Sequence, residues 1–425
     1  MLALPISPCQ KDEDLTPTFK QYIDSQVSSA SITTEIQTVL ESDFVVYKQC
    51  REKALGAIEA SDLTTQLVMR YHHHMSSISP RFDGYESDIK ITFRWFDAFR
   101  PRMQAVCYSF YFDWGNVLWN YAAFESLKAA RIDRSTDEGI RIAHKSFQQA
   151  AGVLDFIKDN IMAHVKVSPV PYTCGGTLPQ LTTSGLVFGR ELMLAQAQLC
   201  FYEKAVRDKK AAGTMKPGII AKLAAQVAVF YRNAIDACAM DPLRVVIDPS
   251  WVGHLEFQAS CFSGCAEYWQ SIVSKEAASE KGSGYGEEIG RLVRAEKFLL
   301  EALDVGQRLK LSPTLTGGAE VLMRAVKTAK AAAERDNNAI YMERVPADTT
   351  IAAVAPVSMV KSSPMSGINI NERPLFKDLI PKSIKILSET AKESISDALR
   401  VAQTEADNAT NEARVTLSSV GLPGR

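Results

Sequence analysis

Apolar residues recur every three or four positions along most of the chain, which is the spacing of amphipathic helices. The longest uninterrupted run is Leu192–Lys209 (LMLAQAQLCFYEKAVRDK), where strong helix formers continue without glycine or proline. Apolar side chains cover most of its circumference, so this helix is predicted to pack on several sides, in the middle of a helical stack. A second helix is predicted over Ile219–Met240. It has two neighbouring apolar stripes, and only one of them can face the core, so the other is a candidate partner surface.

Further helices are predicted on both sides of this central pair. Their ranges are 43–60, 63–75, 117–131, 135–165, 249–274, 286–308 and 317–333. Ser135 is expected to be an N-cap, because Glu138 follows it at the spacing of a capping box. Residues 1–40 contain three prolines and a Ser/Thr-rich stretch, which favour an extended arm. Antiparallel helix pairs with short loops are typical of a solenoid related to tetratricopeptide arrays, although no fixed repeat period is present.

Three segments depart from the helical pattern. Residues Ile89–Phe99 and Met103–Phe110 are rich in β-branched and aromatic residues with partial alternation, and they predict a β-hairpin that turns at residues 100–102. Residues 167–184 are rich in Pro, Gly and Thr and are expected to be a surface loop. Residues Asn337–Pro381, punctuated by prolines, are expected to form an extended strap that runs back over the helices. The predicted fold is therefore mainly α, an elongated curved helical solenoid with a small antiparallel sheet.

Composition narrows the classes of function. The formal net charge is −1, from 48 basic and 49 acidic residues, so no overall basic field favours nucleic acid or an anionic membrane. The eight cysteines are scattered, which is typical of a reducing, cytosolic compartment. No apolar run reaches 18 residues, and the first residues, MLALPISPCQKDED, lack the features of a signal peptide. A cytoplasmic protein without a transmembrane helix is expected.

No constellation predicts catalysis. His72, His73 and His74 are adjacent, and neighbouring helical residues point about 100° apart, so they cannot converge on one metal ion and are expected at a solvated helix terminus. Cys261 and Cys265, near His254, lack a fourth zinc ligand and are expected to be buried free thiols. An enzyme that uses His254 with one of these cysteines is kept as a third hypothesis, which stoichiometric zinc would support. The glycine-rich residues 282–286 lack the Lys-Ser/Thr ending of a phosphate loop. We expect no cofactor, no metal and no small-molecule substrate.

Seven segments, in the same order along the chain, resemble the BRO domain of Alix and related ESCRT-associated adaptors. They are Asp133–Gly139 (DRSTDEG), Phe147–Gly152 (FQQAAG), Leu192–Asp208, Ile219–Leu223 (IIAKL), Gly286–Leu292 (GEEIGRL), Ile340–Pro346 (IYMERVP) and Val360–Pro364 (VKSSP). The resemblance implies one boomerang-shaped helical domain over residues 1–382, with a small sheet where the hairpin is predicted. The polar helical tail, residues 383–425, resembles the junction to the V-shaped domain that follows the BRO domain in longer relatives.

The resemblance also implies a binding surface at Phe201, Ile219 and Leu223. Periodicity alone favours a core position for such residues. In Alix-like proteins the matching positions form an exposed hydrophobic patch, which receives the amphipathic C-terminal helix of an ESCRT-III subunit of the charged multivesicular body protein class. The link AAGTMKPG between the two central helices is longer than in Alix, which leaves the affinity and the choice of partner open.

Asp137 and Tyr341 are two further candidates. Asp137 falls in the first turn of a predicted helix, where a carboxylate stabilises the helix dipole. The resemblance adds that the acidic residue of this motif borders the peptide-binding groove. Tyr341 matches a strap tyrosine that Src-type kinases can use in Alix-like proteins, which makes it a possible site of regulatory phosphorylation. The residue type alone favours a packed aromatic that holds the strap.

Together these features predict a cytosolic, non-catalytic adaptor. It is expected to bind the C-terminal helix of an ESCRT-III subunit and to be recruited to endosomes, where cargo is sorted into multivesicular bodies. Contact with the endosomal membrane is expected to be indirect, through partners. The alternative is a signalling scaffold of the same fold, in an ambient-pH or small-GTPase pathway, without a sorting role.

Overall fold

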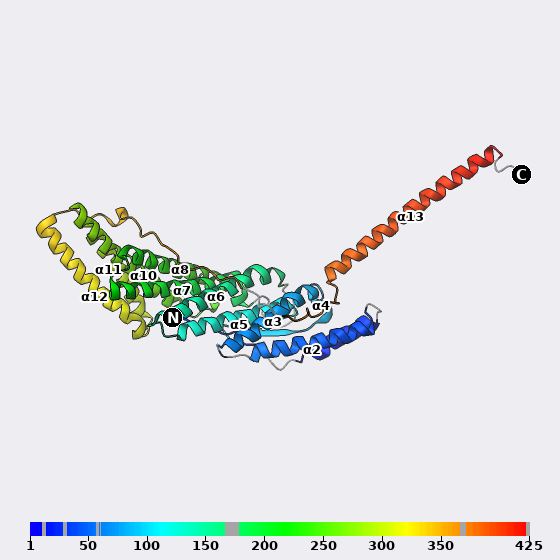
Figure 1. Ribbon diagram of the computed structural model, residues 1–425, viewed down its shortest axis with the longest axis horizontal. Coiled ribbons are helices and arrows are strands. Elements are labelled where there is room, and N and C mark those ends of the chain that lie inside the picture. Colours follow the sequence, from blue (N-terminus) through cyan, green and yellow to red (C-terminus); the bar gives the residue numbers. More distant parts are fainter. Residues whose placement is uncertain are drawn as a thin grey trace.

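The long helices stack in the order of the sequence. In the computed structural model, which describes residues 1–10, 14–28, 32–56, 59, 61–165, 178–365 and 371–421, each long helix from α5 onward packs against the next and the stack curves (Figure 1). These helices are α5 (Phe110–Arg131), α6 (Asp137–Phe156), α7 (Thr183–Ala212), α8 (Pro217–Cys238), α10 (Pro249–Lys281), α11 (Tyr285–Arg308) and α12 (Pro313–Asp336). The predicted solenoid is confirmed, and α7 and α8 are its two central helices.

Short elements join the long ones. Helix α6 continues into a π-turn, η1 (Ile157–Ile161), and a 3₁₀ turn, η2 (Met162–His164), while η3 (Pro179–Leu181) precedes α7 and α9 (Leu243–Val246) lies between α8 and α10. The N-cap of α6 is Thr136, not Ser135 as expected. Its hydroxyl accepts from the Gly139 N–H at 3.0 Å, whereas the Ser135 hydroxyl donates to Asp133 at 2.8 Å. Asp133 thus draws Ser135 away from the capping position. The expected loop 167–184 lies mostly outside the described residues.

The N-terminal part is built from α1 (Thr16–Ser28), α2 (Thr34–Gly56), α3 (Asp62–Phe82), the short α4 (Glu86–Ile89), β1 (Phe93–Phe96) and β2 (Gln104–Cys107). The strands are antiparallel, with Phe93 opposite Cys107, so the predicted hairpin is confirmed. The expected extended arm is wrong where α1 lies. Pro17 is tolerated there because it falls in the first helical turn, and Phe19 stacks on Phe44 with ring centroids 4.1 Å apart.

A buried carboxylate ties these N-terminal elements to α5. Asp113 is fully buried and accepts four hydrogen bonds: two from the Arg51 guanidinium at 2.7 and 2.8 Å, one from the Tyr71 hydroxyl at 2.6 Å and one from Trp95 Nε1 at 2.8 Å. The four donors come from α2, α3 and β1. Because a buried charge is tolerated only when it is paired and hydrogen-bonded, this cluster fixes how the three elements meet α5.

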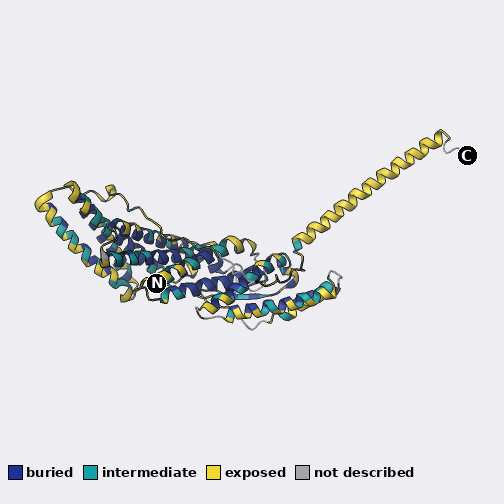
Figure 2. Cartoon of the chain, viewed as in Figure 1, coloured by how far each residue is buried: buried dark blue, intermediate teal, exposed yellow. Residues whose placement is uncertain are grey.

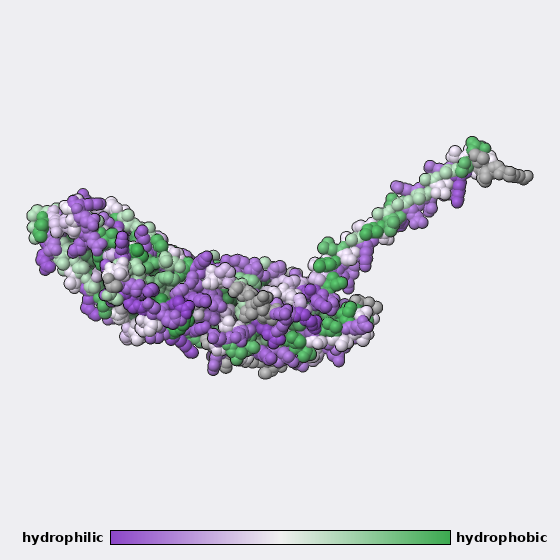
Figure 3. All heavy atoms as spheres, in the orientation of Figure 1, coloured by the Kyte–Doolittle hydropathy of each residue, from purple (hydrophilic) through white to green (hydrophobic). Residues whose placement is uncertain are grey.

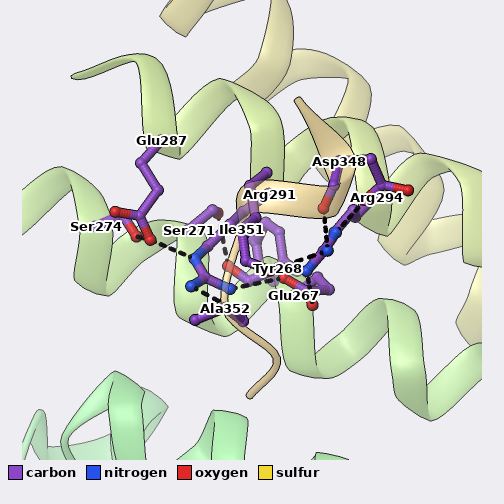
Figure 4. A network of polar contacts seen from close by, with 10 residues as sticks. All are labelled: Glu267, Tyr268, Ser271, Ser274, Glu287, Arg291, Arg294, Asp348, Ile351 and Ala352. Atoms are coloured by element: carbon purple, nitrogen blue, oxygen red, sulfur yellow. Dashed lines mark hydrogen bonds and ion pairs between the residues drawn. The ribbon is translucent and has the colours of Figure 1, made fainter. Parts of the chain in front are cut away.

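The strap after α12 runs back over the helices, as predicted. It begins with a π-turn, η4 (Asn337–Tyr341), and a short 3₁₀ turn, η5 (Asp348–Thr350), and is then extended. Two arginines of α11 hold its first part (Figure 4). Arg291 donates to Glu267 at 3.0 Å and to the Ala352 carbonyl at 3.3 Å, and Arg294 pairs with Asp348. Its last part reaches α3, where Glu372 binds Arg70 at 2.9 Å.

Helix α13 (Lys382–Ser419) leaves the body and projects away from it (Figure 1). None of its residues is buried, and beyond its half-buried first residue it is coloured as exposed in Figure 2, whereas buried residues fill the body. The helical tail predicted from residue 383 is therefore present. In the described part of the chain, no helix combines the length and the hydropathy that crossing a membrane requires.

Candidate functional site

The strap crosses three neighbouring helices at one level. Its Ser363 N–H donates to the Gln148 carbonyl of α6 at 2.9 Å. The Gln198 side chain of α7 makes two bonds of 2.9 Å, donating to the Val357 carbonyl and accepting from the Met359 N–H. On α8, the Lys222 carbonyl accepts from the Val357 N–H at 3.2 Å. These bonds satisfy the backbone of an extended segment that has no sheet partner, and they fix its position across the helices.

A histidine and two apolar side chains lie one helical turn beyond this crossing, toward the α7–α8 connection. His144, Phe201 and Ile219 stand three or four residues from Gln148, Gln198 and Lys222, and residues at that spacing share a helix face. The Phe201 ring is half-buried, with its centroid 4.8 Å from that of His144. Ile219 is 47% exposed. Together with the exposed Val357 and Met359 of the strap, these three residues form what we call the strap-edge surface.

Leu223 does not belong to this exposed set, so the expectation that it is exposed is wrong. Its side chain is 4% exposed and packs in a small cluster with Ala205 and Ile220. Tyr202 and Trp269, from α7 and α10, pack against that cluster. The reason is the side of α8 on which each residue lies: Ile219 is next to the exposed Lys222, whereas Leu223 is next to the buried Ile220, on the side that α7 and α10 cover. Phe201 and Ile219 remain accessible to a partner.

Charged residues flank the strap-edge surface at the start of α6. Asp137 is exposed and pairs with two residues of α7, Lys204 at 3.2 Å and Arg207. The hydrogen bond from Lys204, and then the charge of Arg207, hold the pKa of the Asp137 carboxyl below its usual range. Arg207 also donates to the Ser135 carbonyl at 2.6 Å. Asp137, Lys204 and Arg207 therefore form a rim of mixed charge, in which the Asp137 carboxylate is already paired.

Tyr341 lies at another place in the solenoid. It is in η4, after α12, and its ring stacks on that of Tyr285 in α11, with centroids 3.5 Å apart and planes 7° apart. The adjoining Glu343 carboxylate accepts from the Gly284 and Gly286 N–H groups at the start of α11. Tyr341 thus helps to dock the start of the strap, and its side chain is still 39% exposed. The structure does not bring it together with Phe201 and Ile219.

The histidine triplet is not at a solvated helix terminus, so that expectation is wrong. It lies inside α3, where His72 and His74 are buried. Trp114 Nε1 donates to His72 Nδ1 at 3.2 Å, and His74 Nε2 lies 2.9 Å from Glu372 of the strap. The burial of His72 and His74 could not be predicted from a run of three polar residues, because each buried ring is hydrogen-bonded to a residue that is remote in the sequence. In the described part of the chain, no group of three or more His, Cys, Asp or Glu is placed to hold a metal ion.

Three residues of the strap-edge surface were not foreseen: His144, Val357 and Met359. The sequence signal for Val357 and Met359 was the group of apolar residues between Pro356 and Pro364. An extended segment on the surface has no core of its own, so its apolar side chains either pack on the helices below or remain exposed. The backbone of this strap segment contacts Gln198 through Val357 and Gln148 through Lys361, across 159 and 213 residues of sequence, which no local pattern encodes.

Comparison with known proteins gives consistent matches. A family profile described as "BRO1-like domain" matches residues 1–398. The chain is 28% identical to the vacuolar protein-sorting protein BRO1 of Gibberella zeae, over 88% of this chain and 37% of that protein. It is 30% identical to the programmed cell death 6-interacting protein of Homo sapiens, over 88% and 41%. The chain therefore spans about two fifths of these relatives.

Two more matches bear on function. The pH-response regulator protein palA/RIM20 of Emericella nidulans is 28% identical, over 90% of this chain and 44% of that protein. Among solved structures, the "ALIX BRO1 CHMP4C complex" superposes with a TM-score of 0.70 at 27% identity, and the match covers 89% of this chain and 99% of that one.

Proposed function

The chain belongs to the BRO1-like domain family, and we propose that it is a non-catalytic adaptor that binds the amphipathic C-terminal helix of an ESCRT-III subunit at the strap-edge surface. The observation that carries this proposal is Ile219, an exposed aliphatic side chain beside the half-buried Phe201 and next to the apolar edge of the strap. An amphipathic helix presents apolar anchors at i, i+3, i+4 and i+7, which suit such a surface. The solved complex of ALIX BRO1 with CHMP4C supports this choice of partner.

The flanking charges give the partner helix its direction. Lys204, Arg207 and Asp137 stand at one end of the surface, and the strap stands at the other. Charges at a rim affect the association rate and the orientation of a ligand more than its affinity, whereas buried apolar anchors dominate affinity. Ile219 and Phe201 therefore supply the binding energy in this proposal, and the charged rim sets the register.

In the cell, this binding would recruit the protein from the cytoplasm to endosomes, where it acts in cargo sorting. The match to vacuolar-sorting relatives supports that role. The membrane is reached through the ESCRT-III partner and not by direct contact, and no step needs a cofactor. We assign the adaptor domain to residues 1–382 and the tail to residues 383–425, because the strap ends where α13 begins. Tyr341, partly exposed in its stack, is the proposed site for phosphorylation, which would add a charge beside Tyr285.

Titration calorimetry with a synthetic C-terminal helix of an ESCRT-III subunit tests the proposal. Ile219→Asp is expected to weaken binding at least about tenfold, as loss of a central apolar anchor does. Val293→Asp is the matched control, since Val293 is similarly exposed at 45% but lies on α11. Circular dichroism should show both variants folded. Equal affinities for wild type and Ile219→Asp would reject this surface, and no binding by wild type would reject the partner.

A signalling scaffold is the second candidate, supported by the similarity to palA/RIM20. The two roles differ in what loss of the protein does to a cell. Deletion of the gene should impair sorting of membrane cargo if the adaptor role is correct. An ambient-pH response that fails while sorting stays intact would favour the scaffold.

A further inference from the structure

A pocket of about 300 Å³ lies between α8 and α11. Helix α10 packs against both of these helices and lines the pocket with Ser263 and Ala266, which are too small to fill the space between them. The strap adds Ala353 and Val354 to the wall. The lining residues and the strap-edge surface have no member in common. A volume of this size is at the lower end of the range for pockets that bind ligands.

Two large apolar side chains line the pocket from opposite walls. They are Val229 of α8 and Phe298 of α11, and both are half-buried. In the described part of the chain, neither packs against a cluster of buried residues. Apolar groups that line a pocket without belonging to a core are groups that a ligand can remove from water. The pocket therefore offers apolar contact on both sides to a group that enters it.

Both carboxylates in the wall of the pocket are already paired. Glu267 of α10 accepts from Arg291 at 3.0 Å and from Arg294 at 3.4 Å, and Arg294 also binds Asp348 of the strap (Figure 4). These two arginines hold the strap to α11, so their charges are engaged within the fold. The two carboxylates are likewise not available to a cationic ligand.

Two further cations, Arg232 and Lys297, line the pocket without such a partner. The Arg232 guanidinium on α8 donates to the Ser263 hydroxyl, and Lys297 on α11 acts on Asp348 through its charge, without a hydrogen bond. Among the described residues, no carboxylate forms an ion pair with either side chain, and both are exposed. Because they stand on opposite walls, an anion that enters meets positive charge from both sides.

We propose that this pocket binds an acidic segment of a partner protein. One large apolar side chain of that segment enters between Val229 and Phe298, and the acidic residues next to it pair with Arg232 and Lys297. Apolar anchors that fill a pocket dominate the affinity of such contacts, whereas charges at the rim set the orientation and the association rate. The small side chain of Ala266 leaves room for the anchor.

A phosphate group suits the pocket less well. It carries a charge of about −1.5 to −2 at pH 7, and it would lie beside the two wall carboxylates and against apolar side chains. Taking that much charge out of water is unfavourable unless many donors surround it. The side chain of Asp or Glu carries one charge and can stay at the rim, while its apolar neighbour fills the pocket.

The tail of the chain leaves the body far from the pocket. Lys382, the first residue of α13, pairs with Asp88 of α4 at 2.7 Å. Helix α13 then stands clear of the body, as the space-filling view shows (Figure 3). Helices α10 and α11 lie in the opposite arm (Figure 1). The described tail therefore does not cover the pocket, and the charges around it favour an acidic segment of another protein.

Fluorescence anisotropy with labelled synthetic peptides tests the proposal on the whole chain. The probe is a short peptide with one tryptophan between aspartates. Two matched peptides replace the tryptophan by alanine or the aspartates by lysines. The probe should bind at least about tenfold more tightly than either. Equal affinities for the three peptides, or no binding of the probe, would overturn the proposal.

A cavity-filling variant tests whether the probe occupies this pocket. Ala353→Trp fills the pocket from the exposed strap and should weaken binding of the probe at least about tenfold. Ala355→Trp is the matched control, because Ala355 is exposed on the same strap but does not line the pocket, and it should bind like wild type. Circular dichroism should show both variants folded. Equal affinities for the two variants would place the probe elsewhere and contradict the proposal.

Charge reversal tests the second part of the site. Arg232→Glu/Lys297→Glu should weaken binding of the probe at least about tenfold, whereas Arg324→Glu/Lys327→Glu, on the exposed face of α12, should not. Equal losses in the two double variants would mean that only the overall charge matters.

Two other outcomes would give the probe or the pocket a different role. Ile219→Asp should leave binding of the probe unchanged, so failure here and failure of the proposed function are distinguishable. Loss of probe binding in Ile219→Asp would place the probe on the strap-edge surface. Flotation with anionic vesicles that is abolished by Arg232→Glu/Lys297→Glu, without peptide binding, would show a membrane as the occupant. Either result would overturn the proposal.

Discussion

Gly152 of α6 lies directly beneath the strap at Ser363. A Cβ added to Gly152 would stand 1.6 Å from the Ser363 carbonyl oxygen, which is far closer than any real contact. The strap backbone, held to α6 by the bond from Ser363 N–H to the Gln148 carbonyl, therefore needs glycine at this position. The close approach explains why a small residue interrupts the apolar face of α6 here.

Gly152→Ala should displace the strap from α6. We expect a loss of about 1–3 kcal/mol in unfolding free energy, typical of overpacking, and faster hydrogen exchange of the strap amides. Gly218→Ala is the control, because its added Cβ would meet only Val273 Cγ2 at an ordinary 3.5 Å. Unchanged exchange in the strap of Gly152→Ala would show that the strap moves freely at this position.

Substitutions of Ile219 and Leu223 should differ in their effect on the free energy of unfolding, although the two residues are only one turn apart on α8. Leu223→Ala is expected to cost about 2–4 kcal/mol in unfolding free energy, because it opens a cavity among buried residues. Ile219→Ala should change that free energy by less than about 0.5 kcal/mol, since its side chain is nearly half exposed. Urea denaturation of both variants measures the difference. Equal losses would mean that Ile219 is also covered.

The Asp113 cluster predicts a large effect from a small change. Asp113→Ala would leave the Arg51 guanidinium buried without its counter-ion, and breaking such a pair costs about 3–5 kcal/mol. Asp208→Ala, which removes a partly exposed pair with Lys204, should cost less than about 1 kcal/mol. Chemical denaturation compares the two. A mild effect for Asp113→Ala would show that water enters the site.

His72 makes stability depend on pH. Burial lowers the pKa of His72 to about 4, and protonation would end the hydrogen bond that it accepts from Trp114. Since the folded-state pKa lies below the ordinary value of about 6.5, the contribution is complete above pH 6.5. It is lost as the pH falls from about 6.5 to 4, by up to about 3 kcal/mol. His72→Gln, which keeps an acceptor but does not titrate, should show a flatter stability curve over this range, and parallel curves would contradict the assignment.

The periodicity of apolar residues and the positions of glycine and proline were sufficient to predict most of the helices and the hairpin. The uninterrupted pattern of residues 192–209 and the alternation around the turn at residues 100–102 predicted α7 and the hairpin. Capping was harder to predict, because Ser135 and Thr136 are both good N-caps, and the choice depends on the side chain of Asp133. The α1 helix was missed because Pro17 is a helix breaker everywhere except in a first turn.

The candidate site was predictable only in part. Motif resemblance pointed to Phe201, Ile219 and Leu223, but no local pattern separates the exposed Ile219 from the buried Leu223. That difference depends on which side of α8 is covered by α7 and α10, which is a property of the assembled stack. The same holds for Val357 and Met359, whose position is set by hydrogen bonds to Gln198 from a distant part of the chain.

In a stack where each helix contacts only its neighbours, one end can melt while the other stays folded. The strap couples the two ends of the stack. It is bound by Arg294 near the C-terminal end of the stack, by Gln198 in the middle, and by Asp43 of α2, which accepts from the Phe376 N–H at 2.7 Å. Melting of either end must therefore release a segment that the other end still holds. The helical stack and its strap should therefore unfold cooperatively, in one transition, as a globular domain does and an open repeat array does not.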